Sequence, residues 1–326
     1  MAQIGRLKGV GLGKETSRGT AAAPSFFLPL TDYSFDDKVE IAPREGRKAV
    51  IETTQGGDVV KTWAEGSIEG NVYSDSFGLV LLASFGSVSS AVNSDASGTV
   101  YDHTFSVVDT SNQHQSLTVS LADDEAGDKQ YTNTIIDSLE LKAEEGAYLM
   151  FTADLKGNSE TSGSVTASYS TEYPFRPQDM AIVMADNASS LGSGTALSVK
   201  SLTLKMEKNA EPYFTLGSTS AADFYNKNLD GSIEIEMLYT DDTFRDAWKS
   251  GGTKAFQITL TNSDVTIGTS ANPRLQIVAY QGQIVDWSLN QGNDDIVTQT
   301  ISIRLDYSLS DAKFLEAILT NTQTSY

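Results

Sequence analysis

Side chains suited to acid–base catalysis near neutral pH are scarce in this chain of 326 residues. It has two histidines, His103 beside Asp102 and His114 within the polar stretch SNQHQS, and it has no cysteine. Neither histidine accompanies a Gly-x-Ser-x-Gly nucleophile motif, and no His-Glu-x-x-His zinc motif occurs. The absence of cysteine excludes thiolate nucleophiles, thiolate metal sites and disulfides. We therefore expect no enzyme active site, no bound metal and no cofactor.

Three segments resemble ligand-binding loops, and each lacks an essential residue. The Gly-rich GVGLGKET has Lys14 followed by Glu15 rather than by Ser or Thr, so it does not match a phosphate-binding loop. The run NKNLDGSIEIEM places Met237 where a calcium loop needs a bidentate glutamate. The acidic run DDEAGD at 123–128 fits a solvated hairpin tip better than a cation site. These segments are interpreted as a flexible N-terminal arm, a turn entering a strand, and a hairpin tip.

The chain is strongly acidic, and the acidity is uneven. It carries 23 Lys and Arg against 43 Asp and Glu, a net charge of −20. Residues 1–60 hold eight basic and eight acidic residues, whereas residues 62–160 hold three basic and 16 acidic ones. Such a chain repels phosphates, which disfavours ordinary DNA or RNA binding. The carboxylates either keep a β-rich surface soluble or present a negative surface to something negative, and charge alone favours the first interpretation.

Most apolar residues alternate with polar ones at a period of two. Leu117, Val119 and Leu121 do so in SLTVSL, and the pattern recurs at 233–237 and 301–305. Such alternation is typical of half-buried strands in antiparallel sheets. With 39% hydrophobic and 9% aromatic residues, the chain is expected to be folded and mainly β. It has no run of 18 apolar residues and no apolar region of a secretory signal, so neither a membrane helix nor a leader is expected.

Three short helices are expected among the strands. Residues 76–86 are apolar nearly all round, which predicts a buried helix packed between modules. Its expected packing residues are Phe77, Leu79, Leu81, Leu82 and Phe85. Residues 243–252 place Phe244 and Trp248 on one helical face and end at Gly251. A third helix is expected over residues 314–319, after a Ser308–Asp311 capping pattern.

Two stretches are expected to be irregular. Residues 41–61 contain Arg44, Arg47 and Lys48 among proline and glycines, and a loop of this length is usually functional or disordered. Residues 156–172 are rich in Gly, Ser and Thr and form the natural boundary between the two halves.

The two halves repeat each other in sequence. The pattern Ser-x-x-x-Lys-x-Glu at 34–40 recurs at 201–207, and Gly-Ser-Ile-Glu at 66–69 recurs at 231–234. We infer a tandem duplication of one sheet-plus-helix module. The expected organisation is an N-terminal arm (1–24), a first module with the long loop (25–155), a connection (156–197) and a second module (198–326).

The opening GLGKETSRGTAAAPSFFLPLTDYSF resembles the start of the tail tube (major tail) proteins of long-tailed, siphophage-type bacteriophages. Those proteins often begin Gly-x-Glu-(Ser/Thr)-x-x-Gly-Thr, followed by a Leu-Pro-(Leu/Val) strand. The matching residues here are Gly13, Glu15, Thr16, Gly19 and Thr20, then Leu28, Pro29 and Leu30. The later TWAEGSIEGNVYSDSFGLVLLASFG is similar to the family's strand and buried helix, so the resemblance covers nearly the whole chain.

The resemblance implies a structural virion protein, assembled in the host cytoplasm, whose sheets close with neighbouring copies into rings. Each half would be a β-sandwich or half-barrel module with a packed helix. The rings would stack into a hollow tube that conducts DNA during ejection, in a non-contractile tail. An acidic lumen would repel DNA, and its candidates are Glu140, Glu144 and Glu145. Implied partners are other copies, the tape measure protein, the tail terminator and the distal tail or tail-tip proteins, while genomic DNA passes without specific binding.

Two features bear on ring assembly. The long loop is the candidate contact between stacked rings, through Arg44, Glu45, Arg47, Lys48 and Asp58. A chain with two modules would close a pseudo-hexameric ring as a trimer, unless the second half is an outward decoration on a hexamer.

Two other classes of function remain open from the residues. A monomeric β-sandwich that binds glycans or mediates adhesion would explain the strands and the aromatic residues Trp63, Tyr73 and Trp287. It would not explain the repeat beside a long loop. A metal-assisted glycan hydrolase needs only two carboxylates, yet no spacing supports a pair.

Overall fold

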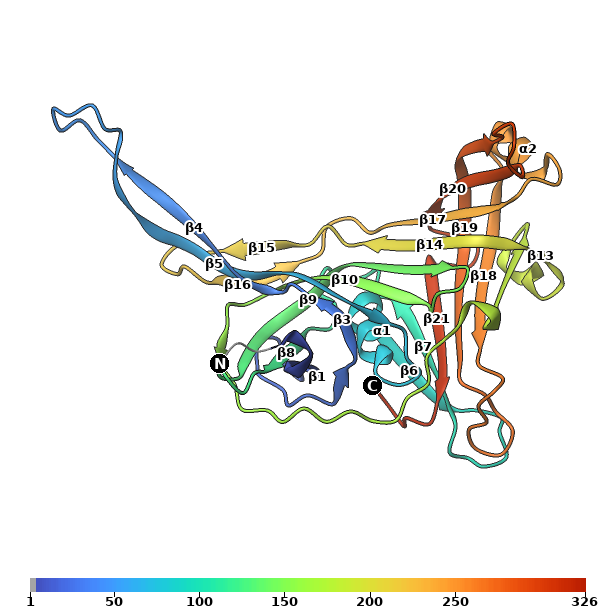
Figure 1. Cartoon of the computed structure of the whole chain (residues 1–326), viewed down its shortest axis with the longest axis horizontal. Helices are drawn as coiled ribbons and strands as arrows, with labels where there is room; N and C mark the ends of the chain where they lie inside the picture. The colour runs from blue at the N-terminus through green and yellow to red at the C-terminus, as the bar shows by residue number, and fades with distance from the viewer. Residues whose placement is uncertain (1–3) are drawn as a thin grey trace.

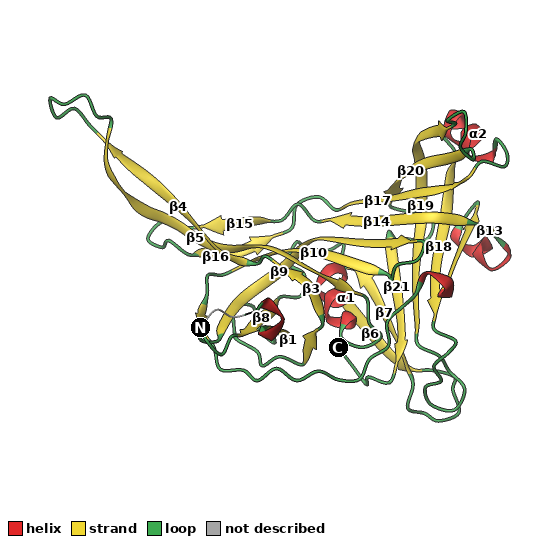
Figure 2. Cartoon of the chain, viewed as in Figure 1, coloured by secondary structure: helices red, strands yellow, loops and turns green. Residues whose placement is uncertain are grey.

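The computed structural model describes residues 4–326 and confirms that the chain is mainly β (Figures 1 and 2). One antiparallel sheet, here called the long sheet, has the strand order β4–β5–β10–β9–β14–β17–β20–β19. Its strands are β4 (Asp36–Glu45), β5 (Thr54–Asn71), β10 (Met150–Gly157), β9 (Lys129–Glu144), β14 (Val199–Glu207), β17 (Asp230–Leu238), β20 (Thr298–Asp306) and β19 (Arg274–Asn290). Because β9 pairs with β14, the sheet runs without a break from the first half of the sequence into the second.

A second antiparallel sheet stands upright at the right of Figure 1. It is built around the first part of β19, in the order β13–β12–β18–β19–β21–β7–β6. The additional strands are β13 (Thr195–Leu197), β12 (Met180–Ala185), β18 (Thr253–Thr261), β21 (Leu315–Asn321), β7 (Tyr101–Val107) and β6 (Gly86–Val92). Since β21 pairs with β7, the two halves of the chain are hydrogen-bonded a second time.

The N-terminal segment is part of the fold, and the expectation of a flexible arm that orders only on assembly is wrong. Strand β1 (Gly9–Lys14) lies between β2 (Phe26–Leu28) and β8 (Leu117–Ala122). Close packing requires glycine at position 13, because a Cβ there would lie 2.5 Å from the carbonyl oxygen of Ala23. The apolar residues of β1 are buried, which the Gly-rich composition concealed.

Glu15 fastens this segment to the rest of the fold. Its carboxylate is 3% exposed and accepts hydrogen bonds at two oxygens. Ser116 Oγ donates at 2.6 Å and the Gly19 amide at 2.7 Å, while Thr118 Oγ1 donates at 3.0 Å and the Asn133 amide at 2.8 Å. One buried carboxylate thus satisfies four donors, which accounts physically for the Gly-x-Glu pattern at the start of the chain.

The expected helix at 76–86 is present as α1 (Phe77–Phe85), and all of its residues are buried. Its apolar surface contacts β9, β6 and β7, and it contacts β1 and β21 more narrowly. Helix α2 (Thr243–Ser250) is also present, and Gly251 ends it with a positive φ of 67°. Figure 2 shows α1 beneath the long sheet and α2 at the far end of the molecule.

The last carbonyls of α1 are bound by the next backbone amide and by two side chains from elsewhere in the sequence. The Gly86 amide donates to Leu82, Lys208 Nζ donates to Ala83 O, and His114 Nδ1 lies 3.4 Å from Ser84 O. A cation at a helix C-terminus is favoured by the helix dipole. Lys208, from the second half, is only 1% exposed and so joins the two halves at this helix. Burial lowers the pKa of Lys208 to about 7.

The expected third helix is wrong, because residues 315–321 form strand β21. Almost every residue of this strand is buried, since β19 and β7 flank it and both of its faces are covered. A short apolar run buried on both faces cannot be distinguished from a buried helix by periodicity. Ser308 and Asp311 bond to each other in the preceding turn, Oγ to Oδ2 at 2.6 Å, rather than cap a helix.

The expected loop at 41–61 is also wrong, because these residues belong to a β-hairpin. Strands β4 and β5 pair along this stretch, and only residues 46–53 at its tip lack strand structure. The hairpin projects far from the body of the molecule, at the upper left of Figure 1, and is here called the arm.

Residues 163–173, by contrast, have no helix or strand, as their polar composition predicts.

We predict that Glu15→Ala lowers the free energy of unfolding by about 3 kcal/mol, because it leaves buried donors without an acceptor. Urea denaturation measures the change. The exposed Glu52→Ala serves as the control and is expected to change stability by less than about 0.5 kcal/mol. An equal loss in both variants would contradict the role assigned to Glu15.

A second prediction concerns the pH dependence of stability. Lys208 has a lowered pKa when folded, so between pH 7 and 9 the unfolded chain binds the extra proton and stability rises with pH. Relative to Lys208→Met, the wild-type chain should gain on the order of 2 kcal/mol over this range. Denaturation at several pH values measures the difference, with the exposed Lys249→Met as the control. A wild-type and Lys208→Met difference that stays flat with pH would refute the assignment.

Candidate functional site: a polar sheet face with two unlike ends

The long sheet has one apolar face and one polar face. On β9 the residues 138, 140, 142 and 144 point to the polar side, while Leu139, Leu141 and Ala143 are buried on the other. The register carries this alternation across the sheet: Glu140 lies between Thr152 of β10 and Lys205 of β14. On the next strand pair, Thr203 faces Glu234, which in turn faces Ser302. A single polar surface therefore spans both halves of the chain.

Carboxylates outnumber basic groups on this polar face. Its acidic residues are Glu65, Glu69, Glu140, Glu144, Asp154, Glu207, Asp230, Glu234, Glu236, Asp286 and Asp306. The basic residues on it or beside it are Lys142, Lys156, Lys200, Lys205 and Arg304. The excess charge is therefore negative.

The basic residues are held by carboxylates close to them. Lys142 pairs with Glu144 at 2.7 Å, Lys200 with Glu236 at 3.1 Å, and Lys205 with Glu207. The neighbouring carboxylates raise the pKa values of Lys142 and Lys205.

Several carboxylates on the face have no such partner. Among the residues that the structure describes, Glu69, Glu140, Glu234 and Asp286 make no ion pair, although Glu140 faces Lys205 across the strands and helps to raise the pKa of that lysine.

The candidate lumen residues fall in two places. Glu140 and Glu144 share the polar face, whereas Glu145 lies in the turn that follows β9. The extent of the face was not predicted, although the alternation in β17 and β20 could have indicated its carboxylates.

The arm leaves one end of the long sheet. All of β4 is exposed, and the arm carries exposed apolar side chains at Val39, Ile41, Val50, Ile51 and Val59. Ile51 at the tip is 97% exposed. A strand pair that buries no apolar surface of its own is typical of a segment that contacts another molecule.

The candidate stacking residues all lie on the arm. Arg44 donates to Asp58 across the two strands, with Nε 2.7 Å from Oδ2, and this hydrogen bond lowers the pKa of Asp58. Glu45 ends β4 opposite Thr54. Arg47 and Lys48 are in the exposed tip, and neither forms an ion pair within the described chain.

A second hairpin projects from the same end of the sheet. Strands β15 (Glu211–Phe214) and β16 (Ala221–Tyr225) follow β14 and precede β17, the positions that the arm occupies in the first half. Leu216 at its tip is fully exposed. The hairpin touches β5, where the Thr62 amide donates to Thr219 O at 2.7 Å. This hairpin was not predicted, although the offset between the repeats could have indicated it.

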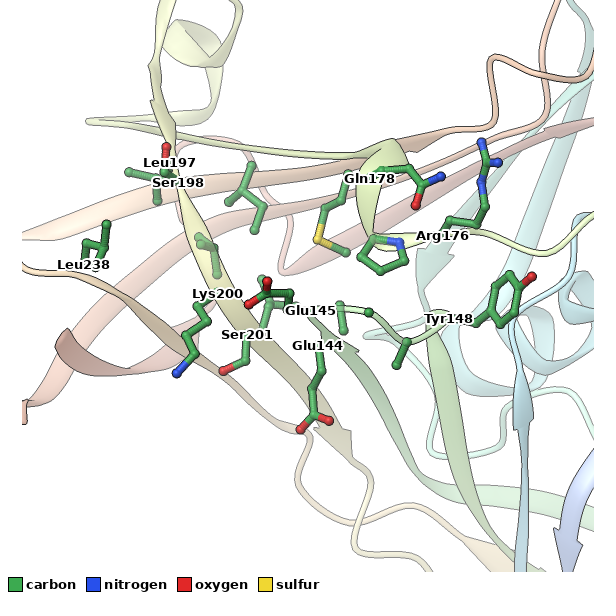
Figure 3. Close-up of a pocket in the computed structure, with 18 residues that line it drawn as sticks. Glu144, Glu145, Tyr148, Arg176, Gln178, Leu197, Ser198, Lys200, Ser201 and Leu238 are labelled. Atoms are coloured by element: carbon green, nitrogen blue, oxygen red, sulfur yellow. The ribbon is translucent and has the colours of Figure 1, made fainter. Parts of the chain in front are cut away.

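The opposite end of the long sheet holds a groove. The register fixes this placement, because Asn71 pairs with Met150, and Met150 with Lys142, at the end farthest from the arm. The groove has a volume of about 1000 Å³. It is lined by residues 143–148, 176–178, Met180, Ile182, residues 197–202 and Leu238. In Figure 3, Glu144 and Glu145 lie across from Gln178, and the Glu144 carboxylate points away from it.

The histidines serve the fold. His103 is buried; its Nδ1 lies 2.7 Å from Ser90 Oγ and its Nε2 lies 3.1 Å from Asn321 Oδ1 and 3.0 Å from Gln323 O. The two carbonyl acceptors require the proton on Nε2, which leaves Nδ1 to accept from Ser90. Burial lowers the pKa values of both histidines, that of His114 to about 4.

The acidic run at 123–128 is a hairpin tip held by its own backbone. The amides of Glu125 and Ala126 donate to Asp123 Oδ1, and Lys8 pairs with Asp123 at 2.7 Å. The calcium-like run instead leads into β17. Within residues 4–326, no group of three or more His, Asp or Glu side chains is arranged to hold a metal ion, and no helix is long and apolar enough to cross a membrane.

The comparison with protein families agrees with this geometry. The family model described as phage tail tube protein matches residues 5–310, nearly the whole chain. No curated protein matches the sequence. The match confirms the resemblance noted in the N-terminal motif and in the strand before α1. The chain therefore belongs to the phage tail tube protein family.

Proposed function

We propose that the chain polymerises as stacked rings into the hollow tube of a phage tail, with the polar face of the long sheet lining the lumen. The observation that carries the proposal is this face: a continuous surface across both halves on which carboxylates outnumber cations and Glu69, Glu140 and Glu234 make no ion pair. DNA phosphates that move past an excess of carboxylates are repelled along the whole lumen, so the lumen does not bind the DNA. DNA would thus be conducted without specific binding.

The rings require lateral contacts between copies. Strand β4 of the long sheet and strands β13 and β6 of the upright sheet each have one strand neighbour, and pairing with another copy would remove these free edges. The repeat supports a ring of three chains with pseudo-hexagonal symmetry, because each half contributes a hairpin at the same end of the sheet. In this arrangement α1 packs where the two modules meet.

The arm is proposed as the contact between successive rings. It is long, exposed and apolar on its surface, and Arg44, Glu45, Arg47, Lys48 and Asp58 supply polar contacts. The setting is the virion of a phage with a non-contractile tail, after assembly in the host cytoplasm. The tube would enclose the tape measure protein and end at the tail terminator and the distal tail or tail-tip proteins.

We expect concentrated protein to form hollow rods of stacked rings in negative-stain electron microscopy. The mass of a single ring distinguishes three chains from six. Globular particles at every concentration, both alone and with a tail-tip complex, would refute the tube. Binding to a glycan array would then favour the adhesion module, and turnover of a glycan would favour a hydrolase.

A further prediction tests the direction of the polar face. Tubes of Glu140→Lys/Glu234→Lys should assemble and should retain more short duplex DNA at low salt than wild-type tubes, because two lumenal carboxylates become cations and the repulsion of phosphates falls. Filter binding of labelled DNA measures retention, which should fall steeply with salt. The control reverses two exposed carboxylates off the face, Asp109→Lys/Asp124→Lys. Equal retention by both tubes would contradict a lumenal position.

A further inference from the structure

The long sheet has a projecting hairpin at one end and a groove at the other, and both carry apolar side chains and charged residues. We propose that the tip of the arm docks into the groove at the opposite end of a copy in the next ring. This inference rests on the proposed tube and names the surface that receives the arm.

The arm and the groove lie at opposite ends of the same strands. The arm begins beyond the pairing of Ala64 with Gly157, and the groove begins beyond the pairing of Asn71 with Met150. These pairs mark the two ends of the same strands, so the arm and the groove point in opposite directions along them. A molecule with a projection at one end and a cavity at the other makes head-to-tail contacts that repeat indefinitely.

The apolar surfaces also fit. The tip presents Val50 and Ile51, of which Ile51 is almost fully exposed. The groove offers Met180, Ile182 and Leu238 among its lining residues. Its volume of about 1000 Å³ lies at the upper end of the range of sites that enclose a drug-sized molecule, so it has room for several side chains of a hairpin tip.

The charges are complementary at the same place. Arg47 and Lys48 in the tip form no ion pair within the described chain. Glu145 at the groove also forms no ion pair within the described chain. Glu144 beside it forms an ion pair with Lys142. Adjacent cations thus meet adjacent carboxylates when the tip enters the groove, which fixes register and discourages wrong partners.

The second half repeats the charge pattern at the groove end. The turn between β19 and β20 carries Asp294 and Asp295, at the end of the sheet where Leu238 faces Thr298. The β15–β16 hairpin lies at the arm end of the same half. Each half therefore has a projecting hairpin at one end and an acidic turn at the other, as successive contacts around a ring require.

The test uses the absence of cysteine from the chain, because an introduced pair then reports one contact. Ile51→Cys/Leu238→Cys is treated with a short bis-maleimide at high protein concentration, and products are separated by denaturing electrophoresis. We expect a ladder of covalent multimers, with the crosslink identified by mass spectrometry. The control, Ile51→Cys/Ser302→Cys, places the second cysteine on the polar face and should remain monomeric. Tubes that form without the Ile51–Leu238 crosslink would overturn the docking while leaving the tube intact. A crosslink without tubes would support the docking and overturn the tube.

Charge reversal provides a second measurement. Arg47→Glu/Lys48→Glu and Glu144→Lys/Glu145→Lys should each slow tube elongation by about tenfold or more, and the fourfold variant should recover most of the rate. Light scattering follows elongation, and Glu140→Lys/Glu234→Lys is the control for Glu144→Lys/Glu145→Lys, with the same change in charge. A fourfold variant no faster than either double variant would overturn the docking.

Discussion

The hydrogen bonding between β9 and β14 is the interaction on which the rest of the structure depends. Seven registered pairs, from Ser201 with Glu144 to Glu207 with Ser138, join strands from the two halves of the sequence. Without them the long sheet would divide into β4–β5–β10–β9 and β14–β17–β20–β19, and the facing edges of β9 and β14 would be unpaired along these residues. With them it has one surface, because side chains alternate between the same two faces on every strand.

This continuity explains why the apolar side chains lie on one face of the sheet and the charged side chains on the other. The face toward α1 is filled by apolar side chains such as Leu139, Leu204 and Ile233. The other face receives the polar residues of the same strands, and its carboxylates exceed its cations. Lys208 and β21 then tie the second half to the first at α1 and β7, so the body of the molecule holds together beneath the sheet.

The sequence predicted the strands with one polar face, helices α1 and α2, and the irregular stretch after β10. These elements have strong local signals: alternation at a period of two, a helix apolar on all sides, and Gly251 after a helical face. It failed where burial is decided by distant partners. Strand β21 was expected to be a helix, because a strand covered on both faces is apolar throughout and shows no alternation. Strand β1 was expected to be mobile because it is rich in glycine, but its glycines permit close packing instead.

The candidate site was predicted in part. Glu140 and Glu144 lie on the polar face, but its extent depends on pairing between halves that no local pattern reveals. The basic cluster at 44–48 lies on the arm, whereas Pro43 and the neighbouring glycines had suggested a loop rather than a paired hairpin. The groove could not be foreseen, because it forms where four separate segments meet.

The central claim is that the polar face of the long sheet looks into the lumen of a tube. A cryo-electron microscopy reconstruction of assembled tubes tests it most directly. The account predicts that Glu69, Glu140 and Glu234 line the channel, with α1 on the outer side of the sheet. Tubes in which these carboxylates face the exterior, or are buried between subunits, would contradict it.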